Sequence, residues 1–166
     1  NVVDGDNVEV SFSTVENVIH SLKKFPVRSE FIHKKNAIDE INFRTLIEDS
    51  EVKSFLNNEF NIRLLWEICR IPDFEKIFND NYIFFLKNTY LVLIKNNIKI
   101  PEDWIYKKIS KLENFKGDIP ELSLKISQIR TWTYISNHYE WFENPYYWQE
   151  KTLKIENELS DNLHIG

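Results

Sequence analysis

Positive charge is concentrated in one short part of this sequence, where it could contact a polyanion. The residues concerned are Lys23, Lys24, Arg28, Lys34 and Lys35, with His33 among them, in a chain of formal net charge −5. Ammonium and guanidinium groups gathered in this way are typical of a strip that contacts the phosphates of a nucleic acid. Such a run of charge is also typical of a solvated linker, so both interpretations stay open.

Aromatic residues form the second candidate group. Eight lie between positions 132 and 148: Trp132, Tyr134, Tyr139, Trp141, Phe142, Tyr146, Tyr147 and Trp148. If exposed, their rings could stack on bases. Their helical spacing favours packing in a core or an interface instead. The predicted structural or interface aromatics are the five tryptophans, Trp66, Trp104, Trp132, Trp141 and Trp148.

Catalytic and metal-binding motifs are missing from the sequence. None of the three glycines, Gly5, Gly117 and Gly166, opens the Gly-Lys-Ser or Gly-Lys-Thr end of a phosphate-binding loop. The lone Cys69 and four scattered histidines do not have the spacing of a zinc site. We therefore expect no catalytic residue, no metal and no cofactor in this chain, and no ATP hydrolysis by it.

The elements that position these residues are expected to be helices. Apolar residues make up 42% of the 166 residues, while glycine (3) and proline (5) are scarce. We predict an all-α fold, a compact bundle of about seven or eight helices (residues 13–166) after a short extended arm (residues 1–12). The sequence has no long apolar run and a single cysteine, which favours a soluble cytoplasmic protein without a membrane partner. The start at Asn1 suggests a piece of a longer chain.

Capping residues and apolar periodicity place the helices. They are expected at about 14–25, 37–49, 51–56, 59–71, 81–97, 101–116, 119–138 and from 145 onward, with residues 26–36 as a connector. In the second helix Ile38, Ile41 and Leu46 are predicted to face inward. Ser50 is the expected cap of the third helix, and Pro101 the expected first residue of the sixth.

Five blocks, in order along the chain, carry a resemblance to a known family. They are RLLWEICRIPDF (63–74), PEDW (101–104), IRTWTYI (129–135), WQE (148–150) and LSDNLH (159–164). Together they resemble the C-terminal helical region of superfamily 2 DExH-box RNA helicases of the mitochondrial degradosome type, in their bacterial form. The resemblance covers about residues 10–164, and the third and fifth blocks are its most specific parts.

The resemblance implies that this chain is an accessory region of an ATP-dependent RNA helicase. Such a region packs against the two motor domains and lines part of the single-stranded RNA path. ATP, Mg²⁺ and the catalytic residues belong to the motor, and no DExH box occurs in this sequence. Arg63, Arg70 and Arg130 lie in the matching blocks and join the candidate RNA contacts.

The implied partners are the parent's motor domains, single-stranded RNA and a ribonuclease. A different interpretation of the same residues is a protein interaction module that docks a nuclease or another subunit without touching RNA. In this alternative, exposed aromatic residues would form the docking surface.

Overall fold

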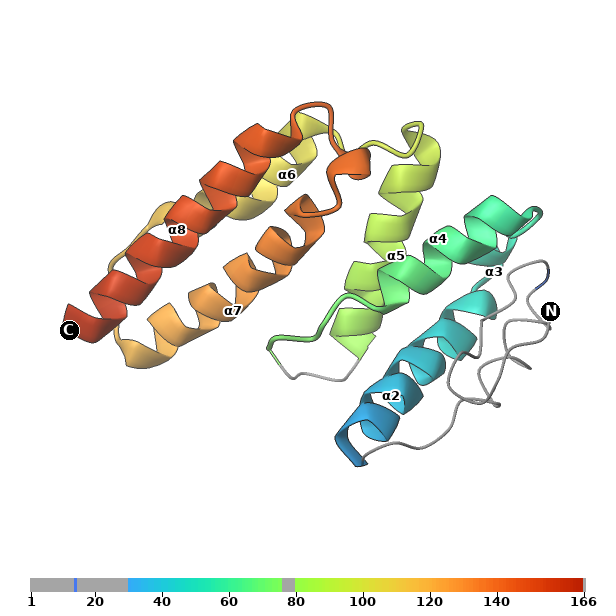
Figure 1. Ribbon diagram of the computed structural model, residues 1–166, viewed down its shortest axis with the longest axis horizontal. Helices are drawn as coiled ribbons and strands as arrows, with labels where there is room; N and C mark the ends of the chain where they lie inside the picture. Colours follow the sequence, from blue (N-terminus) through green and yellow to red (C-terminus); the bar gives the residue numbers. More distant parts are fainter. Residues whose placement is uncertain (1–13, 15–29, 76–79, 166) are drawn as a thin grey trace, which may run out of the picture. The chain divides into compact units, whose positions relative to one another are not determined.

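The computed structural model of the chain describes residue 14 and residues 30–75 and 80–165 (Figure 1). These residues contain seven α-helices, two 3-10 helices and no strand, so the predicted all-α fold is confirmed for this part of the chain. The elements are α2 (Glu30–Ile47), α3 (Ser50–Lys53), α4 (Glu59–Cys69), α5 (Asp80–Lys95), α6 (Glu102–Ser110), η1 (Lys111–Glu113), α7 (Ile119–Ser136), η2 (Tyr139–Trp141) and α8 (Pro145–Ile165). The predicted arm (1–12) and almost all of the predicted first helix (14–25) lie outside the described residues.

The chain divides into two compact units. Unit 1 contains α2, α3, α4 and Ile83–Leu91 of α5, whereas unit 2 contains Ile71–Tyr82 and the residues from Val92 onward. No helix among the described residues combines the length and the apolar character needed to cross a bilayer.

Unit 1 is held by an apolar core and by hydrogen bonds to α5. Phe43 of α2 and Trp66 of α4, both buried, meet edge to face with ring centroids 5.8 Å apart. Asp49 caps α3 by accepting hydrogen bonds from two backbone amides, and its carboxylate lies 2.9 Å from the Lys87 ammonium group. The hydroxyl of Tyr90 donates to the Asn61 carbonyl at 3.1 Å. Polar contacts thus fix α5 against α3 and α4 around the buried rings.

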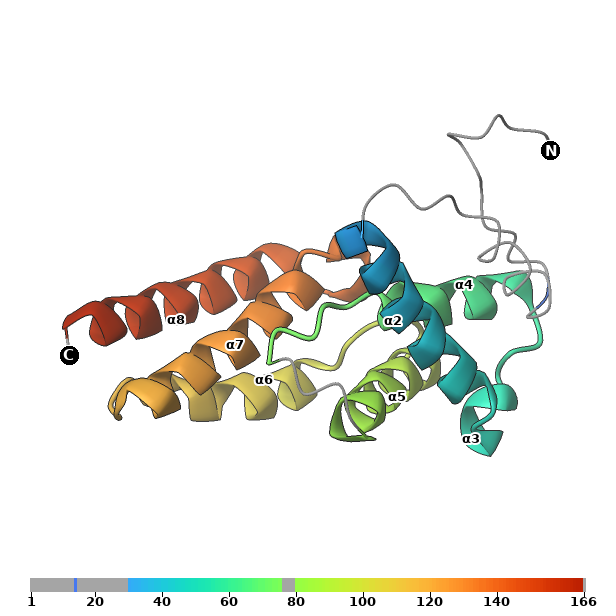
Figure 2. The same cartoon turned by 90° about the horizontal axis from the view of Figure 1, so that it is seen from below.

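Unit 2 is built on the antiparallel pair α7 and α8, which lie side by side in Figures 1 and 2. A capping box starts α7, because Asp118 accepts from the Glu121 amide at 3.0 Å and Glu121 accepts from the Asp118 amide. Between the helices, the hydroxyls of Ser136 and Thr152 lie 3.3 Å apart and are fully buried. These buried hydroxyls help to fix the register of α7 against α8.

The predicted start of α2 was wrong. Residues 30–36, expected to be a connector, belong to this helix, and Ile41, expected to face inward, is 60% exposed. The buried side of α2 carries Asp39, Asn42, Phe43 and Leu46. Because two of these side chains are polar, a search for apolar periodicity misses the face that the helix buries.

Smaller errors concern helix ends. The cap of α3 is Asp49, not Ser50, and Pro101 is the extended residue before α6, not its first helical residue. Helix α6 ends at Ser110 and continues as η1 to Glu113, instead of reaching residue 116. Helix α5 also ends two residues before the predicted position 97. Helix boundaries depend on cap geometry, which residue types constrain only to within one or two positions.

The end of α5 predicts a stabilising substitution. Asn97 and Ile98 have φ of 56° and 60°, the left-handed region, in which a β-branched side chain clashes with its own backbone. Replacing Ile98 with asparagine should raise the free energy of unfolding by about 1 kcal/mol, measured by urea denaturation. A lower midpoint for Ile98→Asn would mean that contacts of the isoleucine side chain outweigh the backbone strain.

Candidate functional site

The basic strip falls largely outside the described residues. Lys23, Lys24 and Arg28 are among the residues that are not described. Lys34 and Lys35 lie in helix α2, but only their backbone is described and not their side chains. Contact between this strip and phosphates therefore stays a prediction.

Two candidate arginines, Arg63 and Arg70, share one side of unit 1. Both are exposed and belong to α4 or its C-terminal cap. Seven residues are nearly two turns of helix, so the two side chains leave the same side about 10 Å apart along the axis. Arg63 forms an ion pair of 3.1 Å with Glu59, whereas Arg70 has no ion pair within the part of the chain that is described. Arg70 is thus the more available cation of the two.

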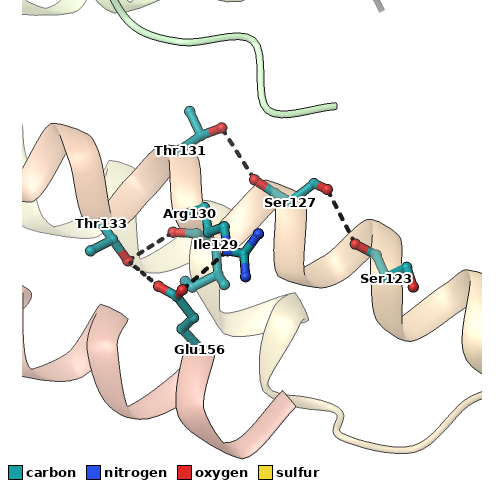
Figure 3. Close-up of polar contacts among 7 residues, drawn as sticks. All are labelled: Ser123, Ser127, Ile129, Arg130, Thr131, Thr133 and Glu156. Carbon is teal, nitrogen blue, oxygen red and sulfur yellow. Dashed lines mark hydrogen bonds and ion pairs between the residues drawn. The ribbon is translucent and has the colours of Figure 1, made fainter. Parts of the chain in front are cut away.

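The third candidate, Arg130, is held by a residue of α8 (Figure 3). Its Nε lies 3.2 Å from Oε2 of Glu156, and the hydroxyl of Thr133 lies 3.3 Å from Oε1 of the same carboxylate. The Arg130 side chain is 52% exposed, while that of Glu156 is 22% exposed. Since the carboxylate occupies Nε alone, the two terminal nitrogens of the guanidinium group keep donors for an external acceptor.

Hydroxyl residues line α7 beside Arg130. The hydroxyls of Ser127 and Thr131 donate to the carbonyls of Ser123 and Ser127, at 3.2 and 3.3 Å (Figure 3). Such bonds to the preceding turn satisfy a hydroxyl inside a helix. Their oxygens retain acceptor capacity, and Ser123 is exposed. This part of α7 therefore presents one oriented cation and the exposed hydroxyl of Ser123, while Thr131 is buried.

The tryptophans occupy interior positions. Trp66, Trp132, Trp141 and Trp148 are buried, and Trp104 is half-buried. The rings of Trp104 and Trp132 meet edge to face, with centroids 5.6 Å apart. The indole nitrogen of Trp148 donates to the Glu102 carboxylate at 3.3 Å, and Trp141 stacks on His138. These contacts join α6, α7 and α8, as a structural role for the tryptophans requires.

Tyrosines of the same stretch differ from the tryptophans. Tyr139, Tyr146 and Tyr147 are exposed, the last two by 80% and 53%. Helical spacing favoured packing for all eight aromatic residues, although the stretch contains both buried tryptophans and exposed tyrosines. Of the eight aromatic residues, only Tyr139, Tyr146 and Tyr147 are exposed and so placed to meet a ligand or a partner.

Shifted pKa values among the described residues follow from local contacts. A hydrogen bond with Lys87 lowers the pKa of Asp49, and one with Glu113 raises the pKa of Lys151. Burial raises the pKa of Cys69 and of Tyr90. Burial, helped by the charge of Asp73, also raises the pKa of Glu75. Ion pairs and desolvation therefore explain these shifts.

A metal-binding cluster of three or more His, Cys, Asp or Glu side chains is not found in the described part of the chain. Comparison of the sequence and the structure with known protein families, curated proteins and solved structures finds no significant match.

Proposed function

We propose that this chain is the C-terminal accessory region of an ATP-dependent RNA helicase, where it buttresses the motor and lines part of the single-stranded RNA path. The proposal starts from the five sequence blocks that resemble the C-terminal helical region of DExH-box RNA helicases. The motor, with its ATP and Mg²⁺, would lie in another part of the parent protein.

One observation supports the proposal most: three of the resembling blocks meet in space. Trp104 of the second block packs on Trp132 of the third, and Glu102 of the second accepts the indole hydrogen bond of Trp148 in the fourth. Residues of these blocks that lie far apart in the sequence therefore contribute to one scaffold. A rigid helical body with buried tryptophan anchors fits the role of a buttress.

The arginines of the blocks suit the second part of the proposed role, which is to line the single-stranded RNA path. Arg70 and Arg130 are exposed, and Glu156 orients Arg130 without using its terminal nitrogens. Bidentate contacts from a guanidinium group are well suited to phosphate. With few such cations, we expect weak RNA binding that falls steeply as salt increases.

A charge-reversal experiment tests the RNA role. Changing Lys23, Lys24, Lys34 and Lys35 together to glutamate should weaken binding of a short fluorescent oligouridylate by about tenfold or more at low salt. Fluorescence anisotropy of the purified chain measures this affinity. Charge reversal of Lys53 and Lys95, two exposed lysines outside the strip and the blocks, is the control.

Two further results decide the helicase assignment. The coding sequence upstream of Asn1 should contain a phosphate-binding loop and a DExH box, and the purified chain alone should hydrolyse no ATP. ATP hydrolysis by the chain, or an upstream sequence that encodes no motor, would refute the proposal.

A protein interaction module is the second candidate, favoured by the exposed Tyr146 and Leu153 on α8. These residues are seven positions apart and so lie on one side of the helix. The four-lysine variant separates the two candidates, since an interaction module without an RNA role would show no change in RNA affinity.

A further inference from the structure

One side of α8 exposes large apolar side chains of unit 2. Tyr146 is 80% exposed and Leu153 is 51% exposed. Glu150, Lys154 and Asn157 are exposed as well and continue this side of the helix in steps of three or four residues. Together these five residues form the α8 face. Exposed apolar side chains that gather on one side of a helix are typical of a docking surface.

The unpaired charges of the α8 face have both signs. Lys151 and Glu156 of the same helix are used within unit 2, in ion pairs with η1 and α7. Glu150 and Lys154 form no ion pair with any residue in the described part of the chain. Glu150 repels a polyanion and Lys154 repels a polycation. The face therefore fits a partner that itself carries both charges.

A second copy of the same face supplies these charges at the required spacing. Glu150 and Lys154 are four positions apart, about 6 Å along the helix axis. When two identical surfaces meet about a twofold axis, residue i contacts residue j and residue j contacts residue i. If two α8 helices lie antiparallel with the axis at the level of Thr152, each Glu150 is opposite Lys154 of the other copy.

The same register brings the apolar side chains into the contact. Leu153 lies one residue from the level of the axis, so it meets its own copy near the centre. Tyr146 lies six residues from that level and meets Asn157 of the second copy, whose amide can hydrogen-bond to the tyrosine hydroxyl. One arrangement thus pairs both charges and covers the exposed leucine and tyrosine.

We propose that two copies of this chain associate through the α8 face, antiparallel about a twofold axis, with ion pairs between Glu150 and Lys154 of opposite copies. The inference goes beyond the proposed helicase role and does not depend on it. A contact made by one helix is smaller than the roughly 800 Å² per partner of a standard interface, so we expect a weak dimer, with a Kd of about 10 µM to 1 mM. Salt should weaken it by screening the ion pairs.

Sedimentation equilibrium of the purified full chain tests the proposal. Glu150→Lys should weaken association at least about tenfold, because it replaces two attractive contacts across the axis with repulsive ones. Lys154→Glu should have the same effect, although it changes the net charge in the opposite direction. The double variant with both substitutions restores the two pairs in exchanged positions and should associate like the wild type.

Charge changes elsewhere in unit 2 are the matched controls. Glu143→Lys and Lys116→Glu alter exposed residues outside α8 that form no ion pair within the described residues. Each of these variants should keep the wild-type association, so that an effect of net charge alone is separated from an effect of the α8 face.

Chemical cross-linking tests the position of the axis. A short bismaleimide should join Leu153→Cys to its own copy, because the two side chains meet beside the axis. Ser123→Cys, at an exposed position of α7, is the control and should not be joined. The native Cys69 does not compete, since it is fully buried.

The proposal is overturned if the wild-type chain stays monomeric up to about 1 mM, the weakest affinity expected for such a contact. It is also overturned if a single charge reversal behaves like its control, or if the double variant associates as weakly as the single ones. Association that persists in all of these variants would place the contact on another surface. None of these results bears on the helicase proposal, which is tested by the upstream sequence and by RNA binding.

Discussion

Replacing Trp132 with alanine is expected to lower the free energy of unfolding by about 3–5 kcal/mol, the usual cost of deleting a large buried aromatic side chain. Trp132 is only 6% exposed and its ring meets Trp104 edge to face. The substitution removes most of a bicyclic side chain from the contact between α6 and α7, and the neighbouring helices can fill the resulting cavity only in part. Urea denaturation followed by far-UV circular dichroism measures the change.

Tyr146→Ala is the control for this substitution. It deletes another aromatic side chain of unit 2, but one that is 80% exposed, so its effect should stay within about 0.5 kcal/mol. Trp132→Phe should have an intermediate effect, because it keeps a ring and leaves a smaller cavity. Equal midpoints for Trp132→Ala and Tyr146→Ala would show that Trp132 is not an anchor of the scaffold.

Helices with clear local signals were predicted well from the sequence. Asn58 precedes α4 and caps it as a residue of its type should, and the apolar period of that helix buries Ile62, Leu65, Trp66 and Cys69. The predicted start of α7 at residue 119 is also correct, and in the structure Asp118 caps the helix with Pro120 in its first turn. In these places capping chemistry and amphipathic spacing agree, and no distant contact is needed to decide the outcome.

Helix α2 shows where prediction from capping residues and apolar spacing fails. Asp39 and Asn42 are buried in unit 1, although their residue types are normally exposed. Whether a polar side chain is buried depends on the groups that surround it, and these come from distant parts of the chain. Helix content was therefore easier to predict than the orientation of the helix.

The candidate contacts depended even more on tertiary structure. The ion pair between Arg130 and Glu156 joins residues 26 positions apart, and it exists because α7 and α8 are antiparallel in one register. Tyr147 could be named from its residue type as a stacking candidate. Its exposure could not be derived from sequence spacing.

Cys69 should react with a thiol reagent at least about 1,000-fold more slowly in the native protein than in the unfolded chain, since a buried group reacts only through rare opening of the structure. The side chain is fully buried in unit 1. Burial, reinforced by the charge of the buried Asp39, raises the pKa of its thiol, so the reactive thiolate is also scarce. Labelling with a chromogenic disulfide, with and without denaturing guanidinium chloride, measures the ratio.

A second thiol provides the internal control. Lys53→Cys places a cysteine at an exposed position of α3, where the native lysine side chain is 61% exposed. This variant should label in two phases, a fast one from position 53 and a slow one from Cys69, so that reagent activity and protection are read in the same sample. Fast labelling of both thiols under native conditions would contradict the prediction. It would mean that the core between α2 and α4 opens readily, and Trp66 could then not serve as a structural anchor, because its contact with Phe43 belongs to that core.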